Sequence, residues 1–177
     1  MSKGHLARQG TRRAARQRLR GVDDPLTLMG VISDVWPDEI LYEATPFSRC
    51  EVAARRVVLS TNLTNYDLPF ALAHELGHLF DAERPTHSQR FAFSSVVGRV
   101  PSEWLNRAES QYCGDPGEAF ASAYAMLSVQ GPWRNVLVVT RHWPADHDEE
   151  VLRIARAVIQ EANRKLLPLA TSASACS

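Results

Sequence analysis

The stretch 73–81 constrains this chain more than any other part of its sequence, because it places two histidines four residues apart with a glutamate directly after the first. Pro69 stands near the start of the surrounding segment, where proline favours the first turn of a helix. Residues four apart on a helix lie about one turn apart along the axis and about 40° apart around it, so His74 and His78 can converge on one ion. The sequence therefore predicts a helix over residues 67–83 that carries a metal-binding pair of imidazoles.

This predicted helix has two different faces. Large apolar side chains gather on one of them: Leu72, Leu76, Leu79 and Phe80. The two histidines and Asp81 lie on the opposite face, which is expected to bind metal or, as the alternative, to be a solvated polar surface. Glu75 lies about 100° from His74 around the axis, where its carboxylate can reach a metal-bound water without binding the metal. Gly77 is about 1 kcal/mol less favourable than alanine inside a helix, which predicts that another backbone passes close beside it.

A third protein ligand has to come from elsewhere, since a catalytic zinc normally has three protein ligands and one open position for water. Glu118 is the favoured candidate because its segment, residues 116–127, is predicted to be a helix with small side chains on the same face. These small residues, which would allow a close approach to the first helix, are Ala121, Ser122 and Ala125. The other candidates are Asp81, His87, Cys113 and Asp115.

Two of these candidates also have structural interpretations. Asp115 followed by Pro116, with Glu118 three residues on, is typical of a capping box with proline at the first helical position. Such a cap would explain Glu118 without a metal. Asp81 can act as an acceptor that orients one of the imidazoles, or as a charge on the helix surface.

In these residues the chain resembles the zincin metallopeptidases that use a glutamate as third zinc ligand, the gluzincins, and within them compact proteins of the ImmA/IrrE type. The resemblance covers residues 55–127. It rests on the sequence Ala-His-Glu-Leu-Gly-His at 73–78 and on Glu-Ala-Phe-Ala-Ser-Ala-Tyr-Ala at 118–125. It implies a zincin-like domain with His74, His78 and Glu118 as ligands of Zn2+ and Glu75 as general base. A protein or peptide substrate of narrow specificity is also implied.

The implied chemistry is hydrolysis of a peptide bond. Glu75 would take a proton from a metal-activated water as that water attacks the carbonyl, and would deliver the proton to the departing amine. A second group that polarises the carbonyl is usual, and the candidates are Tyr112, Tyr124, His87 and His142. If the strand predicted over residues 55–61 is an exposed edge beside the cleft, a substrate could add to it as a further strand. Another type of zinc hydrolase is an alternative.

Charge is distributed unevenly along the chain. Residues 1–20 hold seven basic side chains and no acidic one, although the whole chain has 20 basic and 20 acidic side chains. This basic arm has few large apolar residues and is predicted to be mobile. It can be a solvated tail, a contact for nucleic acid or another polyanion, or a transit peptide. A non-catalytic regulatory or nucleic-acid-binding protein that uses the arm is therefore the main alternative to a peptidase.

One zincin-like domain is predicted over residues 21–167, between the arm (1–20) and a disordered tail of small residues (168–177). No stretch approaches the roughly 18 unbroken apolar residues of a membrane span, and the first residues lack the apolar block of a secretory signal. Three unequally spaced cysteines do not make a disulfide framework. We therefore expect a cytoplasmic protein without membrane contact.

The predicted elements mix helices and strands. Strands are expected over residues 39–43 and 55–61, with a strand or buried segment over 136–139; helices are expected over 24–35, 67–83, 102–109, 116–127 and 149–166. The predicted fold class is α+β, a compact minimal zincin domain. In it, a small antiparallel or mixed sheet packs on the His-Glu-x-x-His helix and on further helices.

Overall fold

The structure is a computed structural model that describes residues 31–64, 67–98, 116–129 and 142–164. Within these residues the fold is α+β, as predicted, with four α-helices and one mixed sheet of three strands. The elements are β1 (Glu39–Glu43), β2 (Arg49–Glu51), the 3-10 turn η1 (Val52–Ala54), β3 (Arg56–Ser60), α3 (Leu68–Glu83), α4 (His87–Val96), α5 (Pro116–Ser128), the 3-10 turn η4 (Ala145–His147) and α6 (Asp148–Arg164). The predicted arm, the C-terminal tail, the helix over 102–109 and the segment 136–139 lie outside the described residues.

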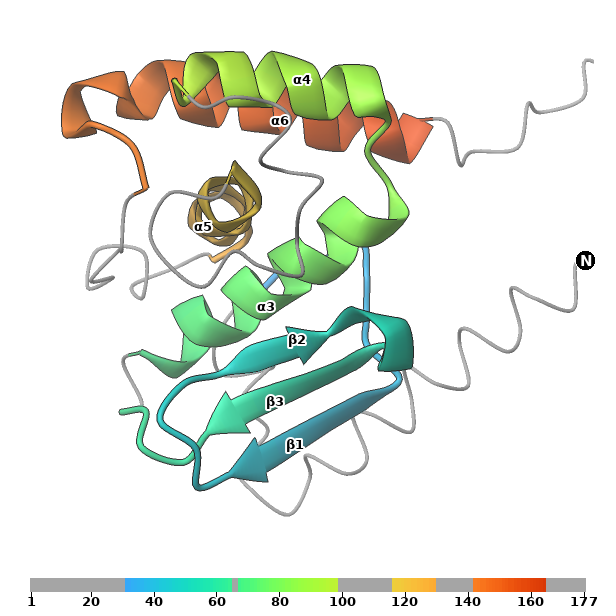
Figure 1. The fold of residues 1–177 in the computed structure, drawn as a ribbon, viewed down its shortest axis with the longest axis vertical. Helices are drawn as coiled ribbons and strands as arrows, with labels where there is room; N and C mark the ends of the chain where they lie inside the picture. Colours follow the sequence, from blue (N-terminus) through green and yellow to red (C-terminus); the bar gives the residue numbers. More distant parts are fainter. Residues whose placement is uncertain (1–30, 65–66, 99–115, 130–141, 165–177) are drawn as a thin grey trace, which may run out of the picture.

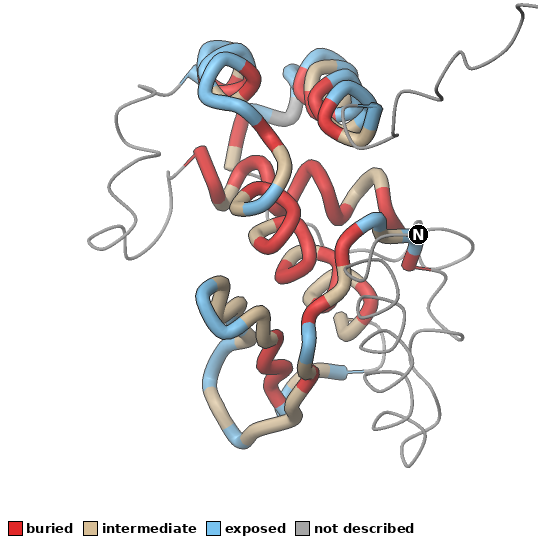
Figure 2. Tube along the Cα trace, turned by 90° about the vertical axis from the view of Figure 1, so that its right-hand side faces the viewer, coloured by how far each residue is buried: buried red, intermediate tan, exposed pale blue. Residues whose placement is uncertain are grey.

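Helix α3 occupies the centre of the arrangement. It lies between the sheet and α5, while α4 and α6 run side by side beyond α5 (Figure 1). The tube coloured by burial shows α3 and α5 as the most continuously buried helices, whereas α4 and α6 each turn an exposed side outward (Figure 2). The helix that carries the two histidines is therefore held from two sides.

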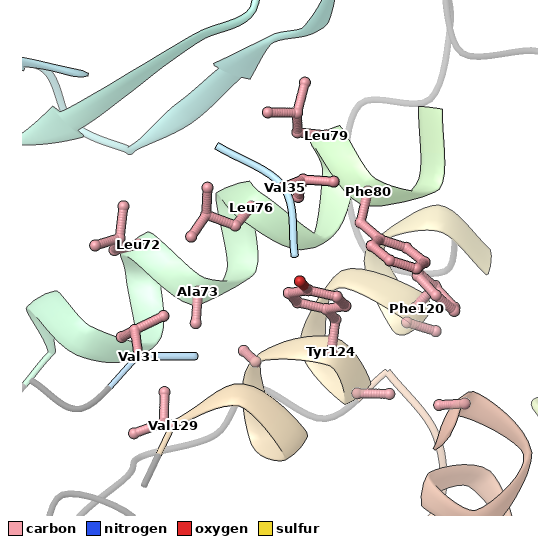
Figure 3. Packing of buried hydrophobic residues seen from close by; sticks show 14 of the residues in the cluster. Val31, Val35, Leu72, Ala73, Leu76, Leu79, Phe80, Phe120, Tyr124 and Val129 are labelled. Atoms are coloured by element: carbon pink, nitrogen blue, oxygen red, sulfur yellow. The ribbon is translucent and has the colours of Figure 1, made fainter. Parts of the chain in front are cut away.

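The core is built on both sides of α3 (Figure 3). Leu72, Leu76 and Leu79 point toward the sheet, and all three are fully or almost fully buried. On the side of α5, Phe80 packs against Tyr124, with ring centroids 5.1 Å apart. The prediction that α3 packs by one face only is wrong. Asp81, expected on the open face, is completely buried because α4 and α5 cover that part of the helix.

Gly77 marks the closest approach of α3 and α5. A Cβ at this position would lie 2.7 Å from the Cα of Ala121 and 3.0 Å from its carbonyl oxygen. No side chain fits there, so the predicted close passage of another backbone is confirmed. The absence of a Cβ is what allows α5 to bring its first turn beside the histidines.

The strand predicted over residues 55–61 is the central strand of the sheet. The order is β1-β3-β2, with β3 parallel to β1 and antiparallel to β2. This strand is therefore not an exposed edge to which a substrate could add; its residues Val57, Val58 and Leu59 are completely buried. A continuous apolar run of this kind is typical of a strand with neighbours on both sides. The short strand β2, which was not predicted, forms one edge of the sheet and β1 forms the other.

Arg55 links the sheet to the end of α3. It follows η1 in a left-handed conformation, with φ 49°, and is the one described non-glycine residue with positive φ. Its guanidinium donates to the carbonyl oxygen of Trp36 (2.7 Å) and to the Asp38 carboxylate (3.2 Å), and it also pairs with Glu83 in the last turn of α3. These partners fix how the sheet sits against α3.

Two further elements depart from the prediction. The described part of the segment 24–35 is not helical, because Val31 forms an antiparallel β-bridge with Val129. Helix α4 was not predicted. Its start carries a capping box between Thr86 and Gln89, a local signal that is visible in the sequence. The strand over 39–43 and the helices α3, α5 and α6 were predicted to within two residues over their described length.

Candidate metal centre

Three side chains meet between α3 and α5. The Nε2 atom of His74 lies 3.1 Å from Oε2 of Glu118, and Nε2 of His78 lies 3.3 Å from Oε1 of the same carboxylate. The two Nε2 atoms are 3.2 Å apart. One ligand atom from each residue falls within 4.8 Å of the others, which is the arrangement that a shared cation requires. Among the described residues, this is the one such group of three.

The two helices position these side chains for clear local reasons. His74 and His78 lie one turn apart on α3, and their rings meet edge to face with centroids 4.8 Å apart. Glu118 lies in the first turn of α5, one turn before the contact of Ala121 with Gly77. Phe70, one turn before His74, places its ring 6.0 Å from the imidazole. The site therefore depends on the close α3–α5 contact.

The protonation states suit a cation. Burial lowers the pKa of His74, although the hydrogen bond from its ring to Glu118 acts in the opposite direction. For Glu118, burial alone would raise the pKa, but hydrogen bonds with His74 and His78 hold it well below its usual range. A neutral imidazole and an ionised carboxylate are the forms that bind metal.

Glu75 lies beside this group without joining it. The residue is 5% exposed, and burial raises the pKa of its carboxyl group to about 7, against the opposing electrostatic influence of His78. The charges of Glu118 and Arg49 also act on it. A carboxyl group with a pKa near neutrality can both accept and release a proton at physiological pH.

Of the other sequence candidates for the third ligand, the described ones, Asp81 and His87, are not part of the group. Asp81 is completely buried, and its Oδ1 accepts a hydrogen bond from Nε of Arg90 at 2.9 Å. Its interpretation as a helix-surface charge is therefore wrong, and it is a structural partner of α4. His87 is exposed at the start of α4. Cys113 and Asp115 lie outside the described residues, so the capping-box interpretation of Glu118 stays a prediction.

The candidates for a carbonyl-polarising group also differ in where the structure places them. The hydroxyl of Tyr124 is 2.9 Å from the Ser33 hydroxyl, and burial raises its pKa to about 12, so it packs in the core. His142 makes a small electrostatic contribution to the lowered pKa of His74. The next residue, Trp143, is buried, and its indole N–H donates a hydrogen bond to Asp148 at 2.7 Å. Tyr112 lies outside the described residues.

Ser122 is a neighbour of the centre that the sequence indicated only as a small residue on the face of Glu118. The Oγ atom of Ser122 lies 3.3 Å from Nδ1 of His74, on the side of the ring away from Glu118. Ser122 follows Glu118 by four residues, so both side chains lie on one face of α5. That spacing was the available signal.

Comparison of the chain with models of known protein families, with curated proteins and with solved structures found no match. None of the described helices combines the length and the apolar character that crossing a membrane requires.

Proposed function

We propose that this chain is a zinc-dependent peptidase of the His-Glu-x-x-His type, with a glutamate as third ligand as in the gluzincins. The observation that carries the proposal is the convergence of His74, His78 and Glu118 on one point, with Glu75 buried beside them. A structural zinc site normally uses four protein ligands, and only three converge among the described residues. Three ligands and a nearby free acid are typical of a catalytic site.

The residues present fit zinc chemically. Two neutral imidazoles and one carboxylate are a common ligand set of catalytic zinc, and all three donor atoms already face one another. Zinc bound there would supply a Lewis acid that polarises a carbonyl oxygen and makes a bound water more acidic. The close contact between Gly77 and Ala121 and the burial of α3 on both sides hold the three side chains in place.

Glu75 is the proposed general base. Its elevated pKa means that the carboxylate, once formed, takes up a proton readily. From this position it would accept the proton of the attacking water and pass it to the departing amine.

The sheet offers an extended peptide a place to bind. Strand β2 contacts α3 and forms one edge of the described three-stranded sheet. An extended peptide could add along this edge. The proposed substrate is a protein or peptide segment in extended conformation, bound at β2 instead of at the buried central strand β3.

Metal analysis together with the substitution Glu75→Gln tests this function. Purified chain should hold about one zinc per molecule, measured by atomic emission, and should cleave denatured casein or a mixture of synthetic peptides, read out by mass spectrometry. Glu75→Gln should retain the zinc, while hydrolysis falls by about 100-fold or more because the proton acceptor is lost. His78→Ala should lose the zinc.

Matched substitutions control for general damage. Glu149→Gln changes an exposed carboxylate on α6, and His87→Ala removes an exposed histidine on α4; both should keep the zinc and the activity. A wild-type chain that neither contains nor takes up zinc would contradict the proposal. So would a Glu75→Gln variant that hydrolyses peptides as fast as the wild type.

The basic arm supports a second candidate function, because seven basic side chains in residues 1–20 favour contact with nucleic acid. Deletion of residues 1–20 separates this function from catalysis. Loss of salt-sensitive binding to nucleic acid, with zinc content and hydrolysis intact, would assign the arm to binding. Unchanged binding would remove this candidate.

A further inference from the structure

Ser122 is the buried polar group that contacts the metal-binding pair from the side opposite to Glu118. Its side chain is completely buried on α5, and its Oγ lies 3.3 Å from Nδ1 of His74. The other nitrogen of the ring, Nε2, lies 3.1 Å from the Glu118 carboxylate. The imidazole of His74 is thus held between a hydroxyl group and a carboxylate.

These two neighbours can form hydrogen bonds with the ring in the metal-free chain. Nε2 of His74 lies 3.1 Å from Oε2 of Glu118 and 3.2 Å from Nε2 of His78, and it donates to the Glu118 carboxylate in the tautomer that carries the proton on Nε2. A neutral imidazole has one N–H, which leaves Nδ1 as an acceptor. Ser122 therefore donates its hydroxyl proton to Nδ1 in this state.

A cation at the centre would reverse this hydrogen bond. Binding through Nε2 requires the lone pair of that nitrogen, so the single proton of the neutral ring has to be on Nδ1. One proton then leaves Nε2 and one is taken up from water at Nδ1, with no change in the charge of the ring. The proton on Nδ1 needs an acceptor, and the nearest polar atom given for it is Oγ of Ser122.

We propose that Ser122 is a positioning residue for His74, and that its hydroxyl group serves because it can donate in the metal-free state and accept in the metal-bound state. This inference rests on the proposed function. A carboxylate in its place could only accept, and an alanine could do neither, which would leave Nδ1–H without a partner in a buried site. The hydroxyl also favours the ring orientation that aims Nε2 at the other two ligands.

Zinc affinity is the first measurement. Ser122→Ala should weaken zinc binding about 10-fold, measured by titration of the metal-free protein with Zn2+ against a chromophoric chelator. Ser122→Thr keeps the hydroxyl group and should recover most of that affinity. Ser94→Ala is the matched control, because Ser94 is also completely buried on a helix but its hydroxyl has no hydrogen-bond partner among the described residues. Its zinc affinity should equal that of the wild type.

The nitrogen resonances of histidine give a second measurement that needs no metal. In metal-free wild type, His74 should show a protonated Nε2 and an Nδ1 that accepts a hydrogen bond; adding zinc should move the proton to Nδ1. Ser122→Ala should shift the Nδ1 resonance of the metal-free chain, and Ser94→Ala should not. An unchanged Nδ1 resonance in Ser122→Ala would overturn the inference even if the threonine variant fails to fold.

The outcomes separate this inference from the proposed function. Unchanged zinc affinity in Ser122→Ala, with a wild type that binds zinc, would overturn the positioning role alone. A wild type that takes up no zinc would overturn both the function and this role. A loss of affinity in Ser122→Ala that Ser122→Thr recovers, together with a shifted Nδ1 resonance, would support the role.

Discussion

Helix α3 holds two buried carboxylates in two regions that treat them differently. Near its end, Asp81 is completely buried and accepts a hydrogen bond from Arg90, which also donates to the Asp81 carbonyl oxygen. In the middle of the helix, Glu75 is 5% exposed, and no described residue donates a hydrogen bond to it. The first acid is neutralised by a fixed cation, and the second has its pKa raised to about 7.

The comparison separates an acid with a fixed cationic partner from an acid with a perturbed pKa. Burial is similar in both places, so burial alone does not distinguish them. The difference is the partner: a bound guanidinium stabilises a carboxylate, whereas a buried carboxylate without a donor keeps a strong preference for its proton. Perturbed acids of the second kind are typical of functional sites.

Breaking the structural region should have the largest effect. Asp81→Ala leaves the half-buried Arg90 guanidinium without its carboxylate, and we expect a loss of about 3 kcal/mol in the free energy of unfolding. Urea denaturation followed by circular dichroism measures this. The double variant Asp81→Asn with Arg90→Met, which removes both charges, should be clearly more stable than Asp81→Ala. A loss below about 1 kcal/mol in Asp81→Ala would show that the pair does not hold α4 against α3.

Removal of the Glu75 carboxylate should raise the free energy of unfolding of the metal-free protein, in contrast to Asp81→Ala. Its folded-state pKa of about 7 lies above the ordinary value of 4.5, so the folded chain keeps a proton that the unfolded chain has released. Stability therefore falls as the pH rises from about 4.5 to about 7 and then levels off. Glu75→Gln removes this fall. The difference in unfolding free energy between variant and wild type should widen in favour of the variant by about 3 kcal/mol between about pH 4 and pH 8.

This second measurement has its own control. It is made by urea denaturation in the presence of a chelator, across the pH range, with Glu149→Gln in parallel. The exposed Glu149 should leave the pH dependence of the wild type unchanged. A wild type and a Glu75→Gln variant with parallel stability profiles would contradict the distinction between the two regions.

Gly77→Ala should have the smallest effect on stability, and its main effect should fall on the candidate metal centre. The new Cβ would lie 2.7 Å from the Cα of Ala121, so α5 has to shift. Overpacking costs about 1 to 3 kcal/mol, and the better helix propensity of alanine returns about 1 kcal/mol, so we expect a net loss of about 1 to 2 kcal/mol. Zinc affinity should fall as Glu118 moves away from the histidines. Equal or greater stability with full zinc affinity would contradict the role of this contact.

The sequence predicted what is local and missed what depends on neighbours. The histidine pair, the glycine at a close backbone approach and Glu118 follow from helix periodicity and residue size, and the structure brings all of them together. Periodicity could not show that α3 is covered on two sides, which places Asp81 against Arg90 instead of in solvent.

Strand order escaped the sequence for a similar reason. Strand β2 has only three residues, too few for a recognisable pattern, yet its position decides that β3 is central. Helix α4 starts with a recognisable capping box, but its apolar content is low, so its sequence has no strong helical periodicity. Pairing between strands and coverage of a helix are tertiary properties that one segment does not encode.

The distance along the chain between the ligands has a consequence for the whole molecule. Glu118 follows His74 by 44 residues, so an ion held by both would cross-link two helices and close a long loop. An ion that binds only the folded chain raises the free energy of unfolding. The increase is about 4 kcal/mol when the ion concentration is about a thousand times the dissociation constant. The melting temperature would then report the supply of the ion, and starvation for it would expose the chain to proteolysis.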